Sequence, residues 1–326
     1  MTSLLARYAE AAFWMARYME RAENMARILD VNETFSRDSR GAQNWRSIIE
    51  LYADDEAFFA SHDEASAKNV IQFYLLDDEH PGSVRASVRM ARENARSLRP
   101  WISTEMWVQL NVFYNRLRAL GPDDVSTHRL ARLCNIIKES VQTHTGITEG
   151  TFYRDESWYF YRLGRQIERA DQTTRLLDVK YHLLLPDVAS VGSSVDLSQW
   201  NALLRSTAGF HAFRRVHPRG LSPDRVASFL LFNRGFPRSL RVSVAELAFR
   251  LGDLREKFDL EGGARAQENL ESLRRRLDEE SIEAVIAGGL HEYLDAIQLE
   301  LIAIGAELGR DFFGWAPLEA QAQGQA

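Results

Sequence analysis

Apolar residues recur every three or four positions through most of this 326-residue chain, and that spacing predicts helices rather than strands. The helical segments predicted from it are residues 4–37, 45–52, 56–61, 65–76, 83–99, 101–120, 123–144, 158–185, 242–258, 264–278 and 282–313. Turn residues separate them, for example His80-Pro81-Gly82 before a predicted Ser83 N-cap, and the pair Gly262-Gly263. The fold class predicted from this pattern is all-α, a multi-helix bundle.

One helical stretch is written twice. Residues 13–31 (FWMARYMERAENMARILDV) return 148 positions later as residues 161–179 (YRLGRQIERADQTTRLLDV). Eight of the nineteen positions are identical, five of them charged: Arg17/Arg165, Glu20/Glu168, Arg21/Arg169, Ala22/Ala170, Arg27/Arg175, Leu29/Leu177, Asp30/Asp178 and Val31/Val179. The apolar face is repeated less closely, because the second copy has Thr173 and Thr174 where the first copy has Met25 and Ala26. The charged positions are therefore repeated more faithfully than the apolar ones.

In each copy four charged side chains share one helix face, because steps of three and four residues stack side chains on one side. They are Glu20, Glu23, Arg27 and Asp30 in the first copy, and Glu168, Asp171, Arg175 and Asp178 in the second. The arginines that directly follow the first glutamates, Arg21 and Arg169, are repeated as well and belong to the same candidate network. We predict that the two long helices pack about a pseudo-twofold axis and bury these faces as an arginine–carboxylate network. A ligand-binding or catalytic site on the same residues stays open. So does a row of surface ion pairs, each worth only about 0.3–0.5 kcal/mol.

The helix after Pro81 carries a column of arginines on one face. They are Arg85, Arg89, Arg92, Arg96 and Arg99. Like charges in a column repel, so an anionic group is expected opposite them. We favour the carboxylates of the repeat helices, because each repeated face carries three acids and one arginine. A bound phosphate or carboxylate ligand is the alternative.

Residues 188–195 (VASVGSSV) predict a linker between a first half, residues 1–187, and a second half, residues 188–315, with a disordered tail at 316–326. Residues 200–241 contain eight arginines and one acid, with aromatic residues between them. This segment predicts a basic surface for an acidic partner, or an anion pocket at Arg234, Arg238 and Arg241; single-stranded RNA is less favoured. As a surface or pocket residue, Arg238 could be replaced by alanine with little change in stability.

Composition narrows the function classes. A net charge of −6 gives no global basic field for DNA. No apolar run predicts a membrane span or a targeting segment, so a cytoplasmic location is expected. The lone Cys134 lies in an apolar run and is expected in the core, not as a nucleophile. The nucleotide, hydrolase and metalloprotease signatures are missing from the sequence, so we predict no cofactor and expect ATP chemistry only from a partner.

The paired carboxylates do not predict a metal centre or an enzyme. A carboxylate-bridged metal bundle needs Glu-x-x-His on two helices, whereas Glu23 follows Glu20 and Asp171 follows Glu168 at that spacing. An arginine lies one turn further on in both copies and competes with a cation. The same arginines favour ionised carboxylates over an acid–base pair. An interaction or scaffold protein is therefore preferred, with no catalytic activity of its own.

Four separated motifs give the chain a family resemblance: ERAENMARILDV, MARENARSLRPWISTEMW, RLGRQIERADQTTRLLDVKY and FLLFNRGFPRSLRVSV. In this order they resemble the bacterial alpha-E domain family, a helical family with a Glu-Arg motif, over residues 4 to about 315. Where that family has Asn-Pro-x-Ser, this chain has His80-Pro81-Gly82-Ser83. The resemblance implies association with a circularly permuted ATP-grasp protein, and often with a transglutaminase-like protein.

That association implies an accessory part in amide or peptide ligation. The chain would bind the ligase, its substrate or a carrier peptide. The alternative is a stand-alone enzyme, or a carboxylate metal bundle, that acts through the paired helix faces.

Overall fold

The computed structural model describes residues 4–38, 45–184 and 194–315, and within these ranges every regular element is helical. The all-α prediction is therefore confirmed. In chain order the helices are α1 (Ala6–Asp38), α2 (Arg46–Tyr52), α3 (Asp55–Phe59), α4 (Ala67–Leu76), α5 (Val84–Ser97), α6 (Thr104–Arg118), η1 (Pro122–Asp124), α7 (Thr127–Thr151), α8 (Glu156–Leu184), α9 (Ser194–Ser206), α10 (Phe210–Val216), α11 (Pro223–Phe232), α12 (Leu240–Phe258), α13 (Ala264–Glu279), α14 (Ile282–Gly288), α15 (Leu290–Leu308) and η3 (Gly309–Phe313).

Local sequence explains where these helices begin and end. The Ser83 hydroxyl accepts a hydrogen bond from the Ala86 amide at 3.0 Å, which confirms the predicted N-cap of α5. The helix predicted over residues 282–313 is interrupted at Gly289, whose φ of 99° suits glycine. The arginine-rich segment, for which no helices were predicted, folds as α9, α10 and α11.

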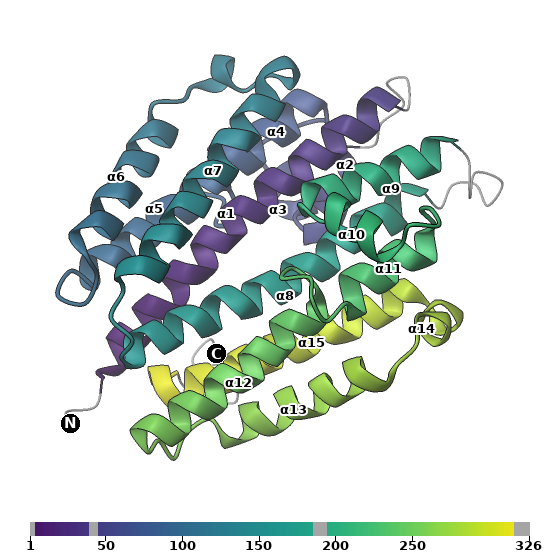
Figure 1. The fold of residues 1–326 in the computed structure, drawn as a ribbon. Coiled ribbons are helices and arrows are strands. Elements are labelled where there is room, and N and C mark those ends of the chain that lie inside the picture. The colour runs from purple at the N-terminus through teal and green to yellow at the C-terminus, as the bar shows by residue number, and fades with distance from the viewer. Residues whose placement is uncertain (1–3, 39–44, 185–193, 316–326) are drawn as a thin grey trace, which may run out of the picture.

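Two groups of four long helices lie side by side, and each contains one repeat helix (Figure 1). In the first group α1 packs against α5 and α7, and α6 packs against both of those helices. In the second group α8 packs against α12 and α15, and α13 packs against both. The repeat helices α1 and α8 pack directly on each other between the groups. They are in contact as predicted, while their relation by a twofold axis stays a prediction.

The helices α1 and α8 approach to backbone contact at Gly164. A methyl group on Gly164 would lie 2.1 Å from the carbonyl oxygen of Phe13, which is well inside van der Waals contact. The corresponding residue of the first copy is Ala16, which is also small and buried. Small residues at the crossing thus let the charged faces of the two helices meet about one turn further along.

The structure also bears on three smaller expectations. Cys134 of α7 is fully buried and burial raises the pKa of its thiol, so its place in the core is confirmed.

No helix in the described ranges is both long enough and apolar enough to cross a bilayer. Residues 188–193 of the predicted linker and the tail at 316–326 lie outside the described residues, so the division of the chain at residue 188 stays a prediction.

Candidate functional site

The two Glu-Arg motifs pair crosswise where α1 meets α8. Glu20 of α1 accepts hydrogen bonds from Nε and Nη2 of Arg169 on α8, both at 2.8 Å. Glu168 of α8 accepts from the same two nitrogens of Arg21 on α1, at 2.7 and 3.1 Å, and from Nε of Arg17 at 2.8 Å. Glu20 is 2% exposed and Glu168 1%. The predicted buried arrangement of these charges is therefore found, and the surface ion-pair alternative is wrong for these two glutamates.

The acids one turn further along pair within their own helix. Glu23 accepts from Arg27, and Asp171 accepts from Nε of Arg175 at 2.9 Å. Each of these arginines also donates to a backbone carbonyl at the end of the short helix packed beside it, Arg27 on α9 and Arg175 on α2. The two copies thus make the same set of contacts on opposite sides of the crossing.

The arginines keep the buried glutamates ionised. Burial on its own raises the pKa of Glu20, but Arg169 and Arg238 outweigh it and hold this pKa well below its usual range. Burial opposes ionisation of Glu168 in the same way, and Arg21 and Arg17 lower its pKa. Both carboxylates are therefore charged at neutral pH, and neither is suited to exchanging protons with a substrate there.

Arg238 is the main departure from the predicted site. Its side chain lies against α1, with Nη1 3.1 Å from Glu20 and Nη2 2.7 Å from Glu23. Arg241 instead pairs with an aspartate of α13, and Arg234 is exposed. The anion pocket predicted from these three arginines is therefore wrong. Arg238 bridges two buried carboxylates, so its assignment as a surface or pocket residue is wrong, and its replacement by alanine is now expected to lower stability.

An open pocket of about 230 Å³ lies beside the other pair, Glu168 and Arg21. Sequence reasoning did not find most of its wall. The residues missed include Tyr52, Asp54, Tyr74, His80 and Gly82, which come from α2, α4 and the turns that follow these helices. The Tyr74 hydroxyl donates to Asp54 at 2.9 Å. The pocket therefore joins the buried network to solvent through a wall of polar and aromatic side chains.

Residues 4–313 match the sequence model of Alpha-E, a family described as "A predicted alpha-helical domain with a conserved ER motif". The chain belongs to the Alpha-E family. The match covers nearly the whole chain and confirms the resemblance drawn from the four motifs. In this Alpha-E protein the Glu-Arg motif occurs twice, and its two copies neutralise each other across the α1–α8 contact.

Two mycobacterial proteins are similar to this Alpha-E chain. They are the "Uncharacterized protein Mb2597" of Mycobacterium bovis and the "Uncharacterized protein MT2643" of Mycobacterium tuberculosis. Each is 26% identical over 238 residues, a stretch that covers 71% of this chain and 26% of the relative. The chain thus spans about a quarter of the length of these curated relatives. No solved structure gives a significant match.

A second internal repeat of the Alpha-E chain would have pointed to three of the missed pocket residues, Tyr74, His80 and Gly82. Residues 73–88 (FYLLDDEHPGSVRASV) correspond to residues 229–244 (FLLFNRGFPRSLRVSV), 156 positions later. Seven positions are identical: Phe73/Phe229, Leu75/Leu231, Pro81/Pro237, Ser83/Ser239, Arg85/Arg241, Ser87/Ser243 and Val88/Val244. In both copies a helix, a Pro-containing turn and a serine-capped helix follow one another. The turn that carries Arg238 is therefore the counterpart of the turn that carries His80 and Gly82.

The arginine column of α5 does not face the repeat helices as predicted. Its members are Arg85, Arg89, Arg92, Arg96 and Arg99. The first two bind Asp78 in the preceding turn, through its carboxylate and its backbone carbonyl. Arg92 and Arg96 pair with Glu93 of the same helix. Arg92 and Arg99 lie over the ring of Trp107 on α6. Nearby acids and aromatic faces thus offset the repulsion, and the prediction that the repeat carboxylates lie opposite is wrong.

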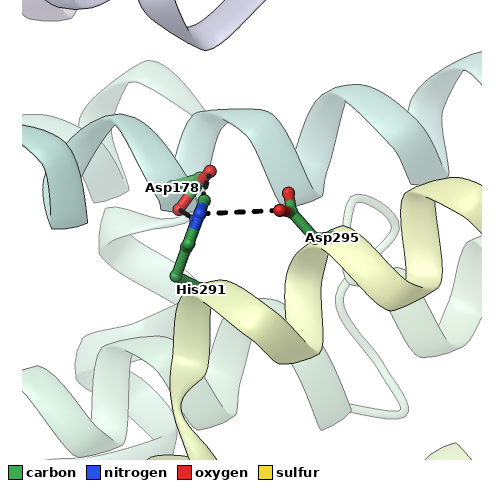
Figure 2. Close-up of side chains that lie close together, drawn as sticks. All are labelled: Asp178, His291 and Asp295. Carbon is green, nitrogen blue, oxygen red and sulfur yellow. Dashed lines mark hydrogen bonds and ion pairs between the residues drawn. The ribbon is translucent and has the colours of Figure 1, made fainter.

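The last aspartate of each repeated face pairs with a residue outside α1 and α8. Asp30 pairs with Lys138 of α7 at 2.9 Å, and Asp178 pairs with His291 of α15 at 3.0 Å. Figure 2 shows Asp178, His291 and Asp295 together, and their ligand atoms lie within 4.8 Å of one another, close enough to share a cation. The corresponding aspartate of the first half pairs with a lysine, which cannot bind a metal while charged. By comparison with the Asp30–Lys138 pair, we interpret the contact between Asp178 and His291 as an ion pair and not as a metal site.

The contact with Asp178 makes this part of the Alpha-E fold sensitive to pH. Burial on its own lowers the pKa of His291, but the hydrogen bond and the charge of Asp178 raise it above its usual value. The stabilisation is complete below the unfolded pKa of about 6.5 and is lost as the pH rises through the folded pKa. We expect the melting temperature of the parent to exceed that of His291→Gln most at about pH 6, and the difference to shrink toward about pH 9. A difference that is constant over this range would contradict the assignment.

Proposed function

We propose that this Alpha-E protein is a non-catalytic accessory protein of a cytoplasmic ATP-grasp-type amide or peptide ligase system. It would bind the ligase, its substrate or a carrier peptide. The observation that carries the proposal is the pairing of a buried, ionised network with an open polar pocket at its edge. A rigid charged framework with an accessible wall is suited to selective binding, whereas proton transfer requires a group whose pKa lies near the working pH.

Two further points support the accessory role. The region occurs within mycobacterial proteins about four times the length of the stretch that matches, so it is compatible with working beside other domains. The family resemblance implies an ATP-grasp protein, and often a transglutaminase-like protein, as those neighbours. An ATP-grasp partner would supply the nucleotide chemistry for which the sequence of this chain has no recognised motif.

The alternatives are less well supported. An enzyme that used Glu20 and Glu168 as acid and base would need one of them protonated near neutral pH, and arginines lower the pKa of both. A carboxylate metal bundle on the same faces would place a cation among the guanidinium groups of Arg21 and Arg169. Binding requires neither a shifted proton equilibrium nor an added ion.

Co-expression with the circularly permuted ATP-grasp protein of the same genome tests the proposal. We expect the two chains to elute together on gel filtration, and the rate of ADP release by the ATP-grasp protein to rise about tenfold or more, a barrier change of about 1.4 kcal/mol. An unrelated helical protein added at the same concentration is the control. Separate elution together with an unchanged rate of ADP release would reject the accessory role.

A further inference from the structure

The open pocket has a filled counterpart on the other side of the α1–α8 crossing. The hydroxyls of Ser83 and Ser239 both donate to a backbone carbonyl six residues earlier. The ring of Phe73 stacks on that of His80 with centroids 4.2 Å apart, and Phe229 stacks on Phe236 at 4.7 Å. Together with the matching contacts of Arg175 and Arg27 to the ends of α2 and α9, these contacts show that the two sites share one construction.

Two differences separate the open pocket from the filled one. Arg238 lies in the filled site, and Gly82 takes its place in the pocket. The fork of Arg238 spans Glu20 and Glu23. No arginine of the described residues spans their counterparts Glu168 and Asp171 in this way: Arg17 binds Glu168 alone, and the neutral Gln172 amide donates to both carboxylates at 3.4 Å. The second difference is Asp54 of the pocket, which corresponds to Gly209 after α9. Each of these two residues follows an alanine with a left-handed backbone, φ 54° before Asp54 and 58° before Gly209, and the amide of each donates to the carbonyl five residues earlier.

The two sites also differ in their numbers of arginines and carboxylates. Three arginines line the open pocket (Arg17, Arg21 and Arg175), and three carboxylates lie with them (Asp54, Glu168 and Asp171). In the filled site Arg27, Arg169 and Arg238 share two carboxylates, and Arg165 lies close enough to act on Glu20. The open pocket thus has more carboxylates and fewer arginines than the filled site, which already holds Arg238. It therefore has the charge balance to accept one more cationic group.

His80 adds a second sign that the pocket takes a ligand. Its side chain is 7% exposed, and within the described residues its Nε2 atom has no hydrogen-bond partner, with Asp54 3.5 Å away. This nitrogen lies 2.6 Å from the point where a Cβ on Gly82 would sit. An unsatisfied buried nitrogen is unfavourable unless a ligand or water pairs with it. It faces the position from which Arg238 enters the filled site.

We propose that the pocket binds the guanidinium group of a ligand, in the place that Arg238 takes in the other half. The fork of the guanidinium spans Glu168 and Asp171, and Asp54 is the third carboxylate. A planar group with several fixed donors suits two adjacent carboxylates better than a compact ammonium does. The ligand is an arginine derivative or an arginine side chain within a peptide. The inference goes beyond the accessory role and does not depend on any ligase.

Titration of the purified chain with small probes tests this site. The probes are Nα-acetyl-arginine amide, its neutral isostere Nα-acetyl-citrulline amide and Nα-acetyl-lysine amide, followed by NMR or calorimetry at millimolar concentrations. We expect one site for the arginine probe and at least about tenfold weaker binding of the other two. A tripeptide with central arginine, compared with the single residue, distinguishes a peptide ligand from a free one. Absence of arginine binding, or equal binding of citrulline, overturns the proposal.

Two variants place the binding in this pocket. Asp54→Asn keeps the size of the side chain and should weaken arginine binding about tenfold or more. The double change His80→Phe with Gly82→Arg copies the Phe236-Pro-Arg238 turn of the filled site, and should abolish binding while keeping or raising the melting temperature.

The matched control for these variants is Arg265→Ala, at a side chain 82% exposed on α13, which should bind arginine as the parent does. Unchanged binding by Asp54→Asn would overturn the site even if the double variant fails to fold. No titration contains the ligase. If the proposed accessory role were rejected, the result for arginine binding would therefore still stand.

Discussion

Glu20→Ala is expected to lower the free energy of unfolding by about 3–5 kcal/mol. The change removes the carboxylate that Arg169 and Arg238 share, so the buried Arg169 loses its carboxylate partner, while Arg238 keeps Glu23. An uncompensated buried charge is far more unfavourable than the loss of a neutral contact. Urea denaturation followed by circular dichroism measures the change, provided that the slope of the transition is the same in both proteins.

The control for Glu20→Ala is an ion pair of the same kind at the surface. Arg46 pairs with Glu50 one turn along α2, and about half of the Arg46 side chain is exposed. Arg46→Ala should change stability by no more than about 0.5 kcal/mol. A loss below about 1 kcal/mol for Glu20→Ala would mean that water reaches the network, and the crosswise pairing could not then be a main source of stability.

Gly164→Ala is expected to destabilise the protein by about 3 kcal/mol or more, at the upper end of overpacking effects. The added methyl group would meet backbone at Phe13, and backbone cannot move aside as a side chain can. The helices α1 and α8 would have to separate, which lengthens the hydrogen bonds of both Glu-Arg pairs. Thermal and urea denaturation measure the loss.

Gly146→Ala is the matched control for Gly164→Ala. Gly146 also lies inside a long helix, α7, but a methyl group there would meet nothing within 4 Å. This change should stabilise the fold by about 0.5–1 kcal/mol, because alanine favours the helix. The two substitutions are chemically identical and are expected to act in opposite directions. The same sign for both would contradict a close backbone approach at Gly164.

The sequence was sufficient to predict most of the helices and the meeting of the repeated faces, but not α9, α10 and α11. Periodicity reports which side of a helix is buried, and a polar pattern that recurs after 148 residues indicates a second constraint on that side. Glu20 and Glu168 were predicted together for this reason. The same reasoning could not place Arg238, because it lies outside the first repeat and its side chain crosses from the turn before α12 to α1.

The arginine column and the pocket mark the limit of periodicity. Spacing placed five arginines on one side of α5, but which element lies opposite depends on packing, and α6 took that position with Trp107. The pocket residues Asp54 and His80 lie in turns, where helical spacing carries no information. His80 becomes recognisable when residues 73–88 are compared with residues 229–244, whereas Asp54 lies outside that repeat.

The crosswise pairing also constrains which substitutions the two copies of the motif can accept. A mutation at Glu20 is compensated not by the adjacent Arg21 but by Arg169, which lies in the other copy of the motif. A change in one copy of the motif therefore has to be matched in the other copy, whereas an uncharged position such as Met25, which corresponds to Thr173, carries no such charge requirement. Two halves that must neutralise each other inside one molecule cannot evolve as independent domains.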